Sequence, residues 1–331
     1  MSRTRAGALA RFASLCAVSF WLGSAPSAAC SVCLPGDPRF SSFGANAEPA
    51  GSVSLYLEAR RFEKSSGGLP HAHEEGEEEH EHEIDEESRG ERLDLYLSWA
   101  ASDRLTFTLD VPFVSTRIIS TEDDVRTRST LAGIGDVSLA STLVLWRDRS
   151  VLPSRWLEGR LWLKAPTGRD ETKVDGERDP HLQPGTGSFD WGVGLAGVQR
   201  FSRGSVFASL FYRENREGSL DYEFGDAFLA NLGFETPLGH WLGRPEWDGV
   251  TPGLELHFRY AGYDHADGER YEDSGGAILY ATPTLRLRLP FGVGDRNASL
   301  RLAVELPLGQ TWLHHEQHEE EVWSLGLLLP F

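Results

Sequence analysis

Hydrophobic and polar residues alternate strictly along most of the chain after Ala50. The segments VSLYLEA (53–59), LDLYLSW (93–99) and LTFTLDV (105–111) each place an apolar side chain at every second position. A period of two is typical of β-strands that have one apolar and one polar face. The pattern recurs over residues 137–145, 157–163, 191–195, 206–212, 228–234, 254–260, 285–289, 300–306 and 323–331. We therefore predict twelve strands.

The predicted connections differ in length in a regular way. The odd-numbered ones are long or polar, and span 64–91, 117–131, 167–188, 214–222, 264–275 and 310–320. The even-numbered ones are mostly shorter, and span 101–103, 147–154, 202–204, 237–250 and 291–297, of which 237–250 breaks the rule. Long loops on one side and tight turns on the other are typical of bacterial outer-membrane barrels. The predicted fold class is an all-β transmembrane antiparallel up-and-down β-barrel of the outer-membrane type, with about 12 strands, over residues 51–331.

The C-terminal segment VWSLGLLLPF (322–331) alternates apolar residues up to a terminal Phe331. This ending resembles the assembly signal of outer-membrane barrels. It places the chain in the outer membrane of a Gram-negative bacterium.

The N-terminus has the features of a secretory signal peptide over residues 1–29. Three arginines precede an apolar run, 12–22, and small residues follow as far as Ala29. The run is too short for a membrane-spanning helix. Without this segment the chain has 29 basic and 50 acidic residues, a formal charge of −21, so nucleic-acid binding is not expected.

A periplasmic N-terminal segment, 30–50, begins with the pair Cys30 and Cys33 in C-S-V-C. In an oxidising compartment the first interpretation is a disulfide. A lipid anchor on Cys30, and a redox or metal role for the pair, stay open.

Three motifs in the middle of the chain resemble a known family. They are GIGDVSLASTLVL (133–145), LWLKAPTG (161–168) and QPGTGSFDWGVGLA (183–196). In this order they resemble the outer-membrane barrel family of MetA-pathway phenol-degradation proteins, whose members often carry the label transporter. The likeness covers mainly residues 91–331. It implies a barrel and passage of small, including aromatic, solutes, and it supplies no catalytic residues.

Polar positions that alternate with lipid-facing ones should face the lumen, since a closed barrel leaves no unpaired edge in hydrocarbon. Charges of both signs occur there, and two interpretations stay open: an ion-pair network that fills a narrow barrel, or a wet path whose charges set solute preference. Arg286, Arg288 and Arg301 fall on adjacent strands and would form a basic stripe that favours anions. The lumen-lining candidates are Arg60, Arg160, Lys164, Arg259, Arg286, Arg288, Arg301, Glu255 and Glu305.

Two predicted outer loops are rich in histidine. HAHEEGEEEHEHEIDEE (71–87) holds four histidines and ten carboxylates, and HHEQH (314–318) lies in the last loop. In a closed barrel strand twelve pairs with strand one, so the two loops lie side by side with bases about 10 Å apart. Imidazoles beside carboxylates suit zinc, copper or nickel, whereas the same composition is typical of a hydrated acidic loop. The candidate metal ligands are His71, His73, His80, His82, His314, His315, His318 and Glu316.

The sequence favours a channel or transporter for small solutes. The alternative is a surface metal-binding protein whose barrel is mainly an anchor. The expected partners are outer-membrane lipid, a small solute and a divalent metal ion, and no cofactor is assigned beyond Zn, Cu or Ni. An enzyme is not expected, because GTGSF (185–189) is not the G-x-S-x-G elbow and lacks its strand-turn-helix context.

Overall fold

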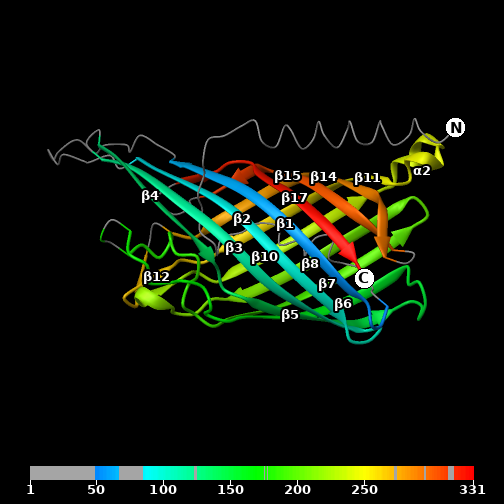
Figure 1. Ribbon diagram of the computed structural model, residues 1–331, viewed down its shortest axis with the longest axis horizontal. Helices are drawn as coiled ribbons and strands as arrows, with labels where there is room; N and C mark the ends of the chain where they lie inside the picture. The colour runs from blue at the N-terminus through cyan, green and yellow to red at the C-terminus, as the bar shows by residue number, and fades with distance from the viewer. Residues whose placement is uncertain are drawn as a thin grey trace.

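The structure is a computed structural model that describes residues 49–66, 85–122, 125–174, 176, 178–271, 274–293, 296–311 and 317–331. The strands of the main sheet are β1 (Val53–Ser66), β2 (Asp85–Ala100), β3 (Leu105–Glu122), β4 (Val125–Ile134), β5 (Ser138–Arg147), β6 (Arg155–Lys164), β7 (Asp190–Phe201), β8 (Gly204–Glu214), β10 (Ala227–Glu235), β11 (Val250–Ala261), β14 (Gly276–Val293), β15 (Arg296–Gln310) and β17 (Val322–Pro330). They wind around a common axis, with β12 at one end and α2 and the C-terminus at the other (Figure 1).

Among the described residues these elements form one closed antiparallel barrel of twelve strands. Each strand pairs with its sequence neighbours, and β1 pairs with both β2 and β17, which closes the ring. β4 and β5 count as one barrel strand, because both pair with β3 and only residues 135–137 separate them. The predicted fold class and strand count are confirmed.

The alternation in sequence becomes the two faces of the barrel wall. On β2, Leu93, Leu95 and Leu97 are 38–47% exposed on the outside, whereas Asp94 and Tyr96 are at most 2% exposed on the inside. In a soluble protein such an apolar outer surface would be costly, but against lipid it is the favourable arrangement. The buried polar side chains of the barrel strands therefore face the lumen.

Three predicted connections are corrected by the structure. In the connection predicted over 64–91, β1 continues to Ser66 and β2 begins at Asp85, so the end of the acidic segment 71–87 belongs to a strand. Residues 117–131 were predicted as a loop, but β3 continues to Glu122 and β4 begins at Val125. Residues 291–297 likewise belong mostly to β14 and β15. Strand ends that project beyond the hydrocarbon need no apolar face, so a hairpin such as Arg117 to Thr130 keeps its pairing without an apolar alternation.

The exceptional connection 237–250 contains helical turns. It holds the helix α2 (Leu238–Leu242) and the 3-10 turn η3 (Pro245–Trp247) at the same end as the C-terminus (Figure 1). Within the described part of the chain, no helix is long and apolar enough to cross a membrane.

The opposite end is covered by structured loops. A small sheet of β9 (Tyr222–Glu223), β12 (His265–Ala266) and β13 (Glu269–Arg270) joins two of them. Next to it, β16 (Gln317–Glu319) pairs with the far end of β1. The predicted signal peptide and the pair Cys30 and Cys33 lie outside the described residues.

Candidate functional site: the charged barrel interior

A belt of charged side chains crosses the lumen at mid-height, and it begins on β1 and β2. Arg60 Nε lies 3.2 Å from Glu58 Oε2, and Arg60 Nη2 lies 3.3 Å from both Asp94 Oδ2 and Tyr96 Oη. Tyr56 Oη donates to Glu58 Oε1 at 2.9 Å. All five side chains are buried, so each charge is held by partners rather than by bulk water.

Arg301 extends the belt across the point where the barrel closes. Its Nη1 lies 3.6 Å from Glu58 on β1, and its Nη2 lies 3.4 Å from Glu255 on β11. Gly326 of β17 lies between Arg301 and Glu58, opposite Glu58 of β1 on one side and opposite Arg301 of β15 on the other. A Cβ on Gly326 would come within 2.5 Å of Cε2 of the Tyr56 ring, so only glycine at this position leaves room for the Tyr56 side chain.

Beyond Glu255 the belt continues through His257, Asn231 and Ser209. His257 Nε2 lies 3.2 Å from Glu255 Oε2, and its Nδ1 shares a 2.7 Å hydrogen bond with Asn231 Oδ1. Asn231 in turn donates to Ser209 Oγ on β8 at 3.0 Å. In the other direction, Arg92 bridges Asp94 at 2.6 Å and Asp110 at 3.8 Å. We call this set the charged belt; its members are Glu58, Arg60, Arg92, Asp94, Asp110, Ser209, Asn231, Glu255, His257 and Arg301.

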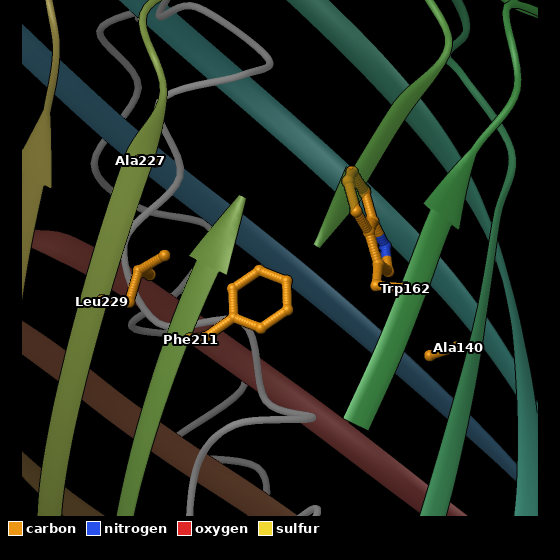
Figure 2. Close-up of a cluster of buried hydrophobic side chains, with 5 residues drawn as sticks. All are labelled: Ala140, Trp162, Phe211, Ala227 and Leu229. Atoms are coloured by element: carbon orange, nitrogen blue, oxygen red, sulfur yellow. The ribbon is translucent and has the colours of Figure 1, made fainter. Parts of the chain in front are cut away.

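The facing wall, on β6 to β8, combines aromatic rings with arginines. Trp162 and Phe211 lie edge to face with ring centroids 6.4 Å apart, and they belong to a buried cluster that points into the barrel (Figure 2). The Arg213 guanidinium lies 6.0 Å from the Trp162 ring centroid. Next to them, Glu158 accepts from the Trp156 indole at 2.7 Å. This wall pairs cations with π faces as well as with carboxylates.

A buried Lys164 ties the long loop 165–189 to the barrel wall. Its Nζ lies 3.0 Å from Asp136 Oδ2 and 2.6 Å from Asp190 Oδ2, and it donates to Ser188 Oγ at 3.2 Å and to Thr186 Oγ1. Asp136 also accepts backbone N–H groups from the loop, including Thr186 N at 2.9 Å. We call Asp136, Lys164, Thr186, Ser188 and Asp190 the loop anchor.

The loop anchor is built from the three motifs that carry the family resemblance. Each motif contributes members, and glycines let their backbones meet: a Cβ on Gly168 would lie 2.8 Å from backbone atoms of both Gly135 and Gly185. Pro184 packs against the inward side of Gly133. Loop 165–189 is thereby held against the inner face of β4, on the lumen side of the wall.

The neighbouring loops are tied to this one by polar contacts. Asp170 accepts from Ser219 Oγ at 2.6 Å. His181 Nε2 lies 3.0 Å from Tyr222 Oη, which donates to Asp264 at 2.6 Å. Burial of the Asp264 carboxyl raises its pKa, although the Tyr222 hydroxyl acts in the opposite direction. Three loops therefore form one cover over part of the barrel mouth.

Just below the mouth, Glu319 of β16 joins strands on both sides of the closure. Its carboxylate accepts hydrogen bonds from the guanidinium of Arg259 on β11 and from the hydroxyl of Tyr280, and it lies 3.6 Å from Lys64 Nζ of β1. At the other end of the lumen, Arg286 Nη2 lies 2.7 Å from Glu235.

The structure places the predicted lumen residues in different surroundings. Seven are buried in the interior, namely Arg60, Arg160, Lys164, Arg259, Arg301, Glu255 and Glu305. Arg286 is half-buried and Arg288 is exposed near the C-terminal end of the barrel. The register places Arg286 opposite Arg301, and each of these two members of the predicted basic stripe also has acidic partners: Glu58 and Glu255 for Arg301, and Glu235 for Arg286.

Of the predicted metal ligands, only His318 lies within the described residues, and it is exposed. His71, His73, His80, His82, His314, His315 and Glu316 lie outside them. Among the described residues, no group of three or more His, Cys, Asp or Glu side chains is arranged to hold a metal ion.

Reasoning from the sequence missed the partners of Lys164. Asp136 and Asp190 both stand in glycine-rich motifs, and the alternation of apolar residues does not mark either one as a lumen residue. The usable signal was the position of each aspartate at the edge of a predicted strand, beside glycines that permit close backbone approach.

The closed twelve-stranded wall, its apolar exterior and its charged interior define an outer-membrane-type β-barrel. No family model matches the sequence, and no curated protein matches it. Among solved structures, the COG4313 outer membrane channel from Pseudomonas putida F1 is similar, with a TM-score of 0.59 and 17% identity over 90% of this chain and 99% of that chain. The translocator domain of autotransporter NalP from Neisseria meningitidis has a TM-score of 0.45 and 13% identity over 88% of this chain and 92% of that chain. A FadL homologue from Pseudomonas aeruginosa has a TM-score of 0.39 and 10% identity over 93% and 97%.

Proposed function

We propose that the protein is a channel or transporter for small solutes in the outer membrane of a Gram-negative bacterium. The observation that carries this proposal is the contrast between the two faces of the same strands, apolar outside and densely charged inside. A barrel that served only as an anchor would be at least as stable with an apolar interior, because replacing buried ion pairs by hydrophobic residues is often neutral or stabilising. A charged interior is useful when hydrated solutes must enter it.

The similarity to a structure described as an outer membrane channel supports this function. The resemblance to the MetA-pathway family extends the proposal to small aromatic solutes, and the three motifs of that resemblance hold loop 165–189 against the lumen wall. The loop anchor would then shape the entrance that such a solute meets.

Planar lipid bilayers test the channel directly. The purified folded protein should give stable current steps at fixed voltage in metal-free salt, and protein heated until the barrel unfolds is the control. A folded barrel that leaves the bilayer silent would contradict the proposal.

A second function, metal binding at the surface with the barrel as an anchor, is supported by one observation. β16 pairs with β1, with Ser65 opposite His318 and Lys64 opposite Glu319. This pairing brings the bases of the first and last loops together, as closure predicts. Imidazoles from both loops would then share one divalent ion.

Zinc titration by calorimetry tests this second function. We expect weak binding at neutral pH that declines below about pH 6, where free histidine protonates. Changing His80, His82, His314 and His315 together to Ala should remove it, whereas His240→Ala, an exposed histidine of α2, should not. Equal binding by all three proteins would exclude the loops as the site.

A further inference from the structure

The acids of the charged belt outnumber its bases once Glu305 is included. Glu305 lies on β15 and is 3% exposed. Its electrostatic neighbours include the belt residues His257, Arg60, Arg301 and Glu255. The belt with Glu305 contains five carboxylates, Glu58, Asp94, Asp110, Glu255 and Glu305, against three guanidiniums, Arg60, Arg92 and Arg301.

The three arginines are already committed to other acids. Arg60 is paired with Glu58 and Asp94, as described above, and Arg92 and Arg301 each bridge two carboxylates. Within the described residues, Glu305 makes no ion pair, and its Oε2 is buried without a hydrogen-bond partner. A buried carboxylate in this state is costly unless it takes up a proton or a positive charge approaches it.

Another buried atom in this region without a hydrogen-bond partner in the described structure is His257 Nε2. It faces the Glu255 carboxylate at 3.2 Å. Even with His257 counted as a base, five carboxyl groups of the belt face four basic side chains, and Glu305 is the acid of this set without an ion pair among the described residues. Of the cations nearer the mouth, Arg259 and Lys64 are held by Glu319.

We propose that Glu305 binds monovalent cations in transit and that the charged belt makes the channel cation-selective. The inference rests on the proposed channel function. A passing ion that gives up part of its hydration shell at the belt would be coordinated by the unpaired Glu305 carboxylate, as carboxylate rings act in cation channels. No fixed multi-ligand metal site is needed. The net negative charge of the chain also attracts cations toward the protein as a whole.

Reversal potentials in a potassium chloride gradient test the inference on the wild-type protein itself. The wild type should prefer potassium to chloride. Glu305→Gln should lower the permeability ratio at least about fivefold, because a unit charge about 4 Å from the ion has that effect in bulk water and a larger one in the less polar interior. Glu305→Asp should keep the preference, and Glu269→Gln, the same change at an exposed loop carboxylate, should leave it unaltered.

Three outcomes would overturn the inference. An anion preference of the wild type would do so without affecting the channel function, and needs no variant to fold. A Glu305→Gln protein that migrates as a folded barrel and keeps the wild-type ratio would show that the carboxylate is neutral or remote from the ions. A silent wild-type bilayer would remove the channel function and the inference with it.

Discussion

Replacing Lys164 by Met removes the one cation of the loop anchor while keeping a side chain of similar length. The Lys164 side chain is 10% exposed, and the two carboxylates it holds, Asp136 and Asp190, are 5% and 2% exposed. Both would remain buried without their counter-charge. Breaking a buried ion pair from one side costs roughly 3–5 kcal/mol.

We expect a loss near the lower end, about 3 kcal/mol, because Asp136 keeps other donors. It accepts the backbone N–H of Thr167 at 3.1 Å, of Gly168 at 2.9 Å and of Thr186 at 2.9 Å. Asp190 keeps the N–H of Arg216 at 3.0 Å. The penalty therefore falls mainly on Asp190, and the double variant Lys164→Met with Asp190→Asn should recover part of it.

The assay is urea unfolding of the folded barrel in detergent micelles, followed by fluorescence of the nine tryptophans outside the predicted signal peptide. Lys173→Met is the matched control, since Lys173 is exposed in the same loop and should change the free energy of unfolding by less than about 0.5 kcal/mol. A loss below about 1 kcal/mol for Lys164→Met, or a double variant less stable than the single one, would refute the ion-pair reasoning.

Three further predictions concern the periphery and the closure of the barrel. Phe331→Ser should lower the amount of protein assembled in the outer membrane, and normal surface levels would remove the terminal residue from the assembly signal. Hydrogen bonds from Ser154 hold the pKa of Asp148 below its ordinary value. The turn that these bonds close is therefore most stable above the unfolded pKa, about 3.9, and becomes less stable as pH falls through the lower folded value. Asp148→Asn should speed amide exchange of Ser154 at pH 7, and an unchanged rate would contradict this. Gly326→Ala should destabilise the barrel by roughly 1–3 kcal/mol through overpacking against Tyr56. Gly309→Ala is the control, because a Cβ there meets nothing within 4 Å. Equal stabilities of the two variants would show that position 326 tolerates a side chain.

The strands and their faces could be predicted from the sequence because they depend on local periodicity. A period of two assigns each side chain to the lipid or the lumen, and the lipid makes the two faces chemically different. Seven of the nine predicted lumen residues are buried inside the barrel for this reason. The continuation of β3 and β4 past Arg117 could not be predicted from the pattern. Beyond the membrane both faces of a strand meet water, so neither face needs to be apolar.

Only the tertiary structure decided which charges meet. Glu58 reaches Arg301 because the strand register aligns both with Gly326 on the strand between them. Asp136 reaches Lys164 because residues 135–137 interrupt a barrel strand beside the end of β6. Such pairings depend on the stagger between strands, which is a property of the closed ring and not of any one segment. Glu305 is left without an ion pair among the described residues in the same way, because the register joins the three belt arginines to other carboxylates.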